Sequence, residues 1–310
     1  MYTEMVGIIF PGQGSQYKGM GKDFYEEFSL VRDIFRKGKE ILGWDPEIMF
    51  EAEEEKLAQT SITQPLIFLL SFSIFQLWKE MDGCTPSFIM GHSLGEYTAL
   101  SASEVFNFED GLKLVKKRGE LMEKAKKGVM SAILGLEREK VEKIVEEAKK
   151  EGIIVAANYN SPLQTVISGE EKAVRTAEEK AKGYGAKRVV RLRVSGAFHS
   201  PLMKEAGENL KKFIDKIDFS SPLYPVIMNV TAQEEKDPEK IKENLMRQMV
   251  EPVRWVDSVK YAVEKGVKIF IEMGPGKVLK GLIKKTVPEV TVYTTDNLLE
   301  FKSVLSEVKK

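Results

Sequence analysis

A short glycine-flanked segment, Gly91-His92-Ser93-Leu94-Gly95, carries the strongest chemical signal in the chain. It matches the pattern G-x-S-x-G, in which a tight turn between a strand and a helix lifts a serine hydroxyl clear of the backbone. The amide of Leu94 would then lie at the start of the helix, where it can stabilise an oxyanion. The pattern favours a nucleophilic serine, and the alternative is a plain strand-to-helix turn with an incidental serine.

A serine needs a base to act as a nucleophile at neutral pH, and histidine is the usual one. The chain has two histidines. His92 is adjacent to Ser93 on the turn, so its side chain should point elsewhere. His199 remains, in Gly196-Ala197-Phe198-His199-Ser200-Pro201. If Ser93 is a nucleophile, elimination makes His199 its base; the alternative is a histidine with no role.

Arg118 lies on the apolar face of a helix predicted over residues 109–127. At about 100° per residue, Arg118 falls between the directions of Leu121 and Met122, while the Lys and Glu residues share the opposite face. A buried guanidinium must be paired, because an unpaired buried charge is costly. Arg118 therefore either forms a structural ion pair with an Asp or Glu, or binds a substrate carboxylate through its bidentate fork.

The elements that must position these residues alternate between strands and helices, which predicts an α/β architecture with a mainly parallel sheet. Ligands gather at the carboxyl ends of the strands in such sheets, and the loops at 11–14 and 91–95 both follow a predicted strand. We predict strands at 6–10, 87–90 and 269–271 and helices at 23–42, 64–80 and 109–127.

A different order of elements begins near Gly128 and predicts an inserted small domain over residues 128–195. The order β-α-β-β-α-β is typical of a ferredoxin-like domain. We predict its strands at 129–134, 153–159, 165–168 and 187–194 and its helices at 138–150 and 170–182. The larger catalytic domain is then built from residues 1–127 and 196–310.

Composition excludes several classes of function. Lys+Arg 47 balances Asp+Glu 47, which argues against a nucleic-acid-binding protein. The most apolar stretch, 65–78, is shorter than the roughly 20 residues of a membrane span, so we expect a buried helix and no membrane partner. The first residues lack the features of a signal peptide, so we expect a cytoplasmic protein.

No metal or cofactor is expected from the residue types. One cysteine, Cys84, and two histidines without an H-E-x-x-H motif exclude the usual zinc sites, and Cys84 is interpreted as a packing residue. Tyr17 stands where a dinucleotide fingerprint after Gly12 needs its third glycine, and Ile271 stands where a P-loop needs its first.

Taken together, these segments resemble the malonyl-CoA:acyl carrier protein transacylases of bacterial type II fatty acid synthesis. The matching segments follow the family's order over nearly the whole chain, which makes the resemblance more specific than any single motif. They are residues 10–16 (FPGQGSQ), 91–97 (GHSLGEY), 117–119 (KRG), 158–162 (NYNSP), 197–200 (AFHS), 247–248 (RQ), 252–255 (PVRW) and 274–279 (GPGKVL).

The resemblance implies a hydrolase-like large domain and a ping-pong transfer of malonyl from malonyl-CoA to the phosphopantetheine thiol of acyl carrier protein. It implies that Ser93 carries the malonyl group and that His199 is its base. The remaining roles that it implies are main-chain oxyanion donors at Gln13 and Leu94, a main-chain carbonyl at Gln248 that orients His199, a malonyl-carboxylate ligand at Arg118 and a pantetheine contact at Asn160.

Three other interpretations are open at this point. A serine hydrolase of the α/β-hydrolase type would use the same elbow and histidine with water as the acceptor. A non-catalytic module that docks acyl carrier protein would need neither, and an acyltransferase of a polyketide pathway would keep the chemistry in another context. Arg118 discriminates against the first, because an esterase acting on neutral esters does not need a buried cation.

Overall fold

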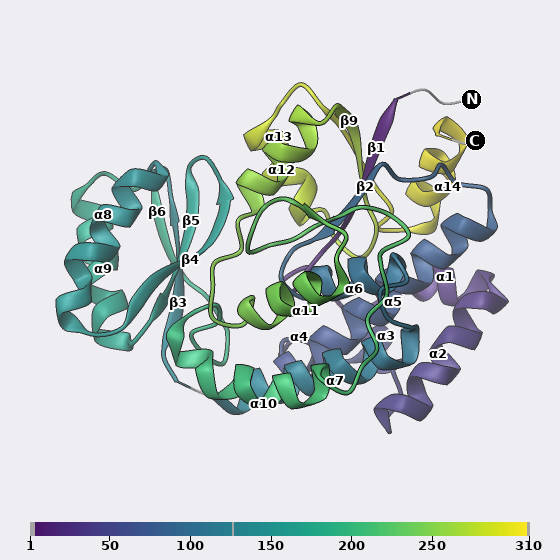
Figure 1. Cartoon of the computed structure of the whole chain (residues 1–310), viewed down its shortest axis with the longest axis horizontal. Helices are drawn as coiled ribbons and strands as arrows, with labels where there is room; N and C mark the ends of the chain where they lie inside the picture. Colours follow the sequence, from purple (N-terminus) through teal and green to yellow (C-terminus); the bar gives the residue numbers. More distant parts are fainter. Residues whose placement is uncertain (1–3, 126, 309–310) are drawn as a thin grey trace.

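Two sheets organise the chain, which the computed structural model describes over residues 4–125 and 127–308 (Figure 1). The larger sheet has the order β10-β9-β1-β2-β7-β8, and its neighbouring strands are parallel except β7 and β8. Its strands are β1 (Met5–Phe10), β2 (Phe88–Gly91), β7 (Val226–Ile227), β8 (Glu234–Glu235), β9 (Val267–Glu272) and β10 (Thr291–Thr294). The central strands are almost wholly buried and apolar, as strands covered on both faces must be.

Helices surround this larger sheet. They are α1 (Lys22–Glu27), α2 (Ser29–Leu42), α3 (Ile48–Glu51), α4 (Glu54–Leu57), α5 (Thr60–Glu80), α6 (Leu94–Ala102), α7 (Phe108–Ala125), α10 (Lys204–Ile214), α11 (Pro238–Arg247), α12 (Trp255–Glu264), α13 (Val278–Thr286) and α14 (Leu298–Glu307), with a 3₁₀ turn at Pro201–Met203. Helix α5 is long and apolar enough to cross a membrane, but 83% of its most apolar window is buried inside the protein. It packs against α2, α6 and α7, which confirms the predicted buried helix.

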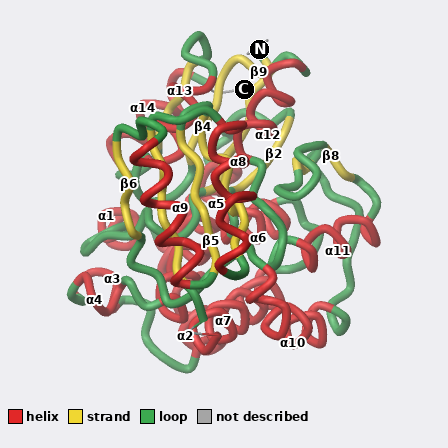
Figure 2. Tube along the Cα trace, turned by 90° about the vertical axis from the view of Figure 1, so that its left-hand side faces the viewer, coloured by secondary structure: helices red, strands yellow, loops and turns green. Residues whose placement is uncertain are grey.

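The smaller sheet is antiparallel and has the order β4-β5-β3-β6. Its elements are β3 (Val129–Leu134), α8 (Arg138–Ala148), a 3₁₀ turn at Lys149–Glu151, β4 (Ile154–Ser161), β5 (Gln164–Gly169), α9 (Glu171–Gly183) and β6 (Arg188–Arg191). Figure 2 shows α8 and α9 lying over one face of these strands. Side chains alternate along β3: Ile133 joins the core beneath the two helices, while Met130 and Ala132 join the core of the larger unit.

The order of elements in this segment is the predicted one, but β6 ends at Arg191, before the predicted residue 194. The predicted helix at 23–42 is two helices, because Phe28 is extended (φ −113°, ψ 126°) and packs against the core between α1 and α2. Helix α5 begins at Thr60, before the predicted residue 64. Helix α7 ends at Ala125, and residue 126 of the predicted helix lies outside the described residues.

Direct contacts join the smaller sheet and its helix α8 to the segment around the start of α12. Asn158 of β4 forms a parallel bridge with Val253, and the Val253 amide donates to the Ala157 carbonyl at 2.9 Å. Arg138 of α8 forms an ion pair with Asp257 of α12 at 3.0 Å. These contacts fix the smaller unit beside the loop that precedes α12.

Candidate active site

Ser93 lies on a strained turn between β2 and α6, with φ 52° and ψ −106°. A Cβ atom on Gly91 would lie 2.0 Å from the Gly95 carbonyl oxygen, and one on Gly95 would lie 2.1 Å from the Phe10 carbonyl oxygen. Both flanking positions therefore require glycine, since real Cβ contacts are never so short. The turn leaves the Ser93 hydroxyl free to face other side chains, as the G-x-S-x-G pattern predicts.

His199 approaches this hydroxyl from the loop after the smaller unit. Its Nε2 lies 2.8 Å from Ser93 Oγ, and its Nδ1 lies 2.7 Å from the Gln248 carbonyl oxygen. A carbonyl only accepts, so Nδ1 carries the proton and the Nε2 lone pair faces Ser93. Burial, together with the nearby charge of Arg118, lowers the pKa of His199 to about 3. The imidazole is neutral at pH 7 and has the protonation state that a general base requires.

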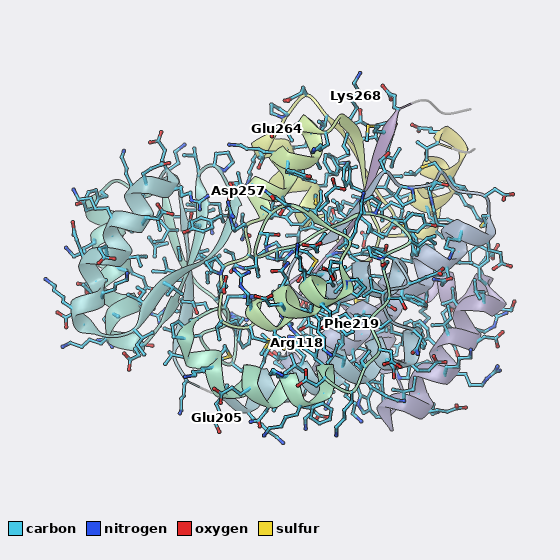
Figure 3. All side chains as sticks on the ribbon, viewed as in Figure 1. Arg118, Glu205, Phe219, Asp257, Glu264 and Lys268 are labelled. Carbon is cyan, nitrogen blue, oxygen red and sulfur yellow. The ribbon has the colours of Figure 1, made fainter. Side chains whose placement is uncertain are left out.

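Arg118 is fully buried on α7, as the helix-face argument predicts (Figure 3). Its guanidinium donates to Gln64 Oε1 at 2.8 Å, to Gln248 Oε1 at 2.9 Å and to Ser93 Oγ at 3.0 Å. Within residues 4–125 and 127–308, no Asp or Glu lies at ion-pair distance from it. Its charge thus faces the serine without a carboxylate partner, which speaks against the structural ion pair.

The residues that sequence reasoning missed form a buried network behind Ser93. Asn229 Oδ1 accepts from the Ser93 amide at 2.9 Å, and Asn229 Nδ2 donates to the Gly91 carbonyl at 2.7 Å. The Glu96 carboxyl accepts from the main-chain amide of Asn229 at 2.5 Å and from Gln248 Nε2 at 3.1 Å. Burial raises the pKa of the Glu96 carboxyl, and the donated hydrogen bonds and Arg118 oppose that shift. The available signal was Glu96 itself, the one charged residue of α6.

His92 points away from the serine, as predicted. Its Nε2 lies 2.7 Å from Asn160 Oδ1, and its ring packs against Trp255 with centroids 5.5 Å apart. Burial lowers the pKa of His92. Asn160 is therefore close to the site, and in this structure its side-chain oxygen is engaged by His92.

Two main-chain amides near Ser93 are candidates for binding an oxyanion. Among the residues that the structure describes, neither the Gln13 amide nor the Leu94 amide donates a hydrogen bond. Leu94 is the first residue of α6, where the free amides and the helix dipole favour negative charge. Gln13 follows β1 and lines the same cavity as Ser93. Both amides are available to an oxyanion.

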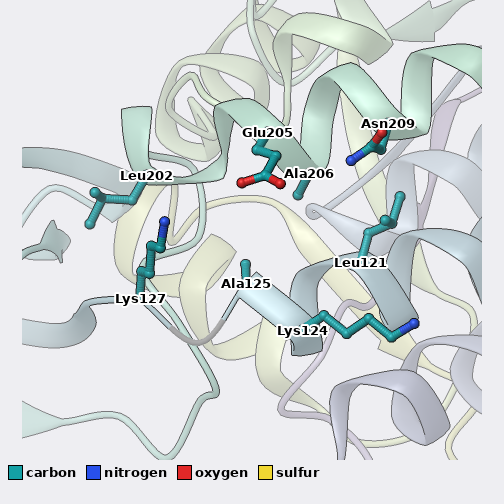
Figure 4. A pocket seen from close by; sticks show the side chains of 8 residues that line it. All are labelled: Leu121, Lys124, Ala125, Lys127, Leu202, Glu205, Ala206 and Asn209. Carbon is teal, nitrogen blue, oxygen red and sulfur yellow. The ribbon is translucent and has the colours of Figure 1, made fainter.

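The cavity at Ser93 has a volume of about 100 Å³ and is lined by Gln13, Gln64, His92, Ser93, Met122, Met130, Asn158, Leu192, Val194, Phe198 and His199. Residues of both the larger and the smaller unit contribute to it. A second cavity of about 240 Å³ lies between the end of α7 and the start of α10 (Figure 4). Its lining includes Lys124, Lys127 and Glu205 but no nucleophile beside a base, so the chemistry belongs to the cavity at Ser93. Among the described residues, no group of three or more His, Cys, Asp or Glu could hold a metal ion.

Comparisons with known proteins agree with this geometry. The protein-family model described as the acyl transferase domain matches residues 8–301 of this chain. The malonyl CoA-acyl carrier protein transacylase of Bacillus subtilis is 44% identical over 285 residues, which cover 90% of each chain. The solved structure of the malonyl CoA-acyl carrier protein transacylase of Coxiella burnetii superposes with a TM-score of 0.96 at 37% identity, covering 99% of this chain and 98% of the other.

A further solved structure contains a type II polyketide synthase acyl carrier protein in complex with its malonyl-transacylase. It superposes with a TM-score of 0.95 at 37% identity, covering 98% of this chain and 100% of the other.

The fold and the matched domain define the class of the protein: it is an acyltransferase with a mixed α/β fold and a mainly parallel sheet. Within that class, the chain belongs to the family of malonyl CoA-acyl carrier protein transacylases.

Proposed function

We propose that this enzyme transfers the malonyl group from malonyl-CoA to the phosphopantetheine thiol of acyl carrier protein, for fatty acid synthesis, through an ester on Ser93. One observation carries the proposal: the Ser93 hydroxyl contacts a neutral imidazole on one side and, on the other, a buried guanidinium that forms no ion pair with an Asp or Glu of the described residues. The first contact suits acyl transfer, and the second suits an acyl group that ends in a carboxylate.

The reaction has two half-reactions of the same kind. Ser93 Oγ attacks the thioester carbonyl of malonyl-CoA while His199 Nε2 takes its proton, and collapse of the tetrahedral intermediate breaks the C–S bond. The proton returns from His199 to the CoA sulfur, and the malonyl ester remains on Ser93. The thiol of the carrier then gives its proton to His199 and attacks the ester carbonyl. Collapse of this second tetrahedral intermediate breaks the C–O bond to Ser93, His199 returns the proton to Ser93 Oγ, and the malonyl thioester of the carrier leaves.

We assign the oxyanion donors to the amides of Gln13 and Leu94. Support comes from their lack of an acceptor among the described residues and from the position of Leu94 at a helix N-terminus. The Gln248 carbonyl takes the place of the acidic third member of a triad, because its 2.7 Å contact holds the Nδ1–H tautomer of His199.

Arg118 is assigned to the malonyl carboxylate, which it would bind through the planar fork of its guanidinium. This assignment separates the proposal from a serine hydrolase that acts on neutral esters, which gains nothing from a buried cation beside its nucleophile. Phe198, which resembles the malonyl-selective pattern of the family, lines the same cavity.

The finer architecture belongs to the same proposal. We divide the chain into a hydrolase-like catalytic domain, residues 1–127 and 196–310, and a ferredoxin-like domain, residues 128–195; support comes from the antiparallel order β4-β5-β3-β6 with its two helices. The enzyme is proposed to use no cofactor or metal, to bind neither nucleic acid nor membrane, and to work in the cytoplasm. Asn160 is proposed to contact pantetheine after exchanging its bond to His92.

Incubation with malonyl-CoA, followed by mass spectrometry of the digested protein, tests the proposal. We expect a malonyl adduct on Ser93 that is discharged by holo acyl carrier protein and lost in Ser93→Ala. Ser101→Ala is the matched control, since it removes another buried hydroxyl of the same helix region, one without a hydrogen-bond partner. Discharge by water at the same rate without carrier would support the hydrolase, and no adduct at all would support the docking module. Comparing carriers from fatty acid and polyketide pathways separates the two transferase contexts.

A further inference from the structure

Glu96 is a fully buried carboxyl that the reaction itself does not use. Its Oε2 accepts from the main-chain amide of Asn229 at 2.5 Å, and its Oε1 accepts from the side-chain amide of Gln248 at 3.1 Å. Burial raises the pKa of this carboxyl to about 8, but two N–H donors directed at its two oxygens favour the carboxylate, which accepts at both.

Gln248 connects this carboxyl to the guanidinium. Its Nε2 donates to the Ser93 carbonyl at 2.9 Å, to Glu96 Oε1 at 3.1 Å and to Asn229 Oδ1 at 3.3 Å. Its Oε1 accepts from Arg118 at 2.9 Å. A glutamine amide is a donor at one end and an acceptor at the other. The acceptors that hold the NH₂ group of Gln248 therefore also determine that its Oε1, and not its Nε2, faces Arg118.

We propose that Glu96 is a positioning residue for substrate selection: by holding Nε2 of Gln248, it keeps Oε1 of Gln248 turned to Arg118 and so aims the guanidinium at the substrate carboxylate. The inference rests on the proposed function, in which Arg118 binds malonyl. Glu96 would thus contribute to acyl selectivity although it contacts neither the substrate nor the reacting atoms.

The isosteric change Glu96→Gln isolates this role. The new side chain has one acceptor oxygen and one NH₂ group, but it faces two N–H donors. The Asn229 amide belongs to the main chain and cannot turn, so the oxygen of the new side chain stays with it and the NH₂ group faces Gln248. Two NH₂ groups then face each other, while the Ser93 carbonyl still accepts from Gln248 Nε2. The Gln248 side chain has to shift to relieve this contact, which moves its Oε1 away from Arg118. The guanidinium has only donors, so weakening this acceptor changes its position.

The experiment compares the rates of Ser93 loading from malonyl-CoA and from acetyl-CoA by rapid quench and intact-mass spectrometry. Loss of one hydrogen bond to a charged group predicts that Glu96→Gln lowers kcat/KM for malonyl-CoA about 10- to 100-fold. Loading from acetyl-CoA, which has no carboxylate, should fall much less. The readout is the ratio of the two rates, which a general loss of folded protein would not change.

Glu272→Gln is the matched control. Glu272 is also fully buried, and its carboxyl accepts from the amides of Leu279 at 3.1 Å and Lys280 at 2.8 Å at the start of α13. The same change there removes the same atom type, so it should reduce stability and leave the malonyl-to-acetyl ratio unchanged.

Two results would overturn the inference: a Glu96→Gln enzyme that keeps the wild-type ratio, or one that loses both substrates in equal proportion. If that variant does not fold, Gln248→Met decides, because it removes both ends of the amide and leaves the main-chain carbonyl that holds His199. It should lower the malonyl-to-acetyl ratio whatever its effect on the acetyl rate, and an unchanged ratio again refutes the inference. Absence of a malonyl adduct on wild-type Ser93 would refute the proposed function instead.

Discussion

Replacing Arg118 by alanine tests the carboxylate-binding role at its centre. A bidentate contact with malonyl supplies two hydrogen bonds between charged groups, worth about 1.5–3 kcal/mol each, or about 3–6 kcal/mol together. Arg118 already donates to Gln64, Gln248 and Ser93, and it must give up part of these bonds to bind substrate. The lower half of that range is therefore appropriate, which corresponds to a loss of about 10²- to 10³-fold in kcat/KM for malonyl-CoA.

A neutral acyl group gives a different expectation for the same variant. Arg118 then contributes its bond to Ser93 Oγ at 3.0 Å, worth about 1.5 kcal/mol at the lower end of the range for a bond to a charged group, so loading from acetyl-CoA should fall about tenfold, less than the loss for malonyl-CoA. Arg118→Lys is the control that keeps the charge and removes the fork, and it should recover only part of the malonyl rate.

The assay is single-turnover loading of Ser93 from each thioester at several concentrations, with circular dichroism to verify folding. Equal losses for malonyl and acetyl in Arg118→Ala would refute the reasoning, because a residue that recognises a carboxylate cannot matter equally to a substrate that lacks one.

Two further predictions concern stability. The pKa of His199 is about 3 in the folded protein and about 6.5 in the unfolded protein, so only the unfolded state binds the proton between these two values. The free energy of unfolding therefore falls as the pH drops from 6.5 toward 3, by up to about 1.4 kcal/mol per pH unit. Urea unfolding at pH 7 and pH 5 measures this slope, and a His199→Gln variant with the same slope would contradict the prediction. Gly95→Ala places a Cβ 2.1 Å from the Phe10 carbonyl oxygen and should cost at least about 2 kcal/mol in urea unfolding, whereas Gly281→Ala, with no atom within 4 Å of the new Cβ, should not destabilise; equal stability of the two variants would show that the elbow tolerates side chains.

The parts of the site that the sequence could predict are those whose chemistry is rare in the chain. Two histidines made elimination possible, and the apolar face of α7 marked Arg118 because a single cation interrupts it. The strand-turn-helix order around Ser93 follows from local patterns of a few residues. Each of these inferences needs only neighbours along the chain.

The network behind Ser93 could not be predicted in this way. Asn229 and Glu96 are 133 residues apart in sequence, and Gln248 and Glu96 are 152 apart. Nothing in the local pattern at Asn229 distinguishes it from any other polar loop residue, because its role depends on where β7 ends beside β2. Similarly, the break at Phe28 depends on the core into which its ring packs, so hydrophobic periodicity alone predicts one continuous helix.

The bridge between Asn158 and Val253 has a mechanical consequence. Gln248, whose carbonyl holds the imidazole, and Val253, which is paired with the neighbouring sheet, are joined by only a short stretch of chain. Moving the smaller unit away from the larger one would pull on that stretch and tilt the ring of His199 away from Ser93. A compound that binds between Asn158 and Val253 and separates them would therefore inhibit the enzyme without occupying the cavity at Ser93.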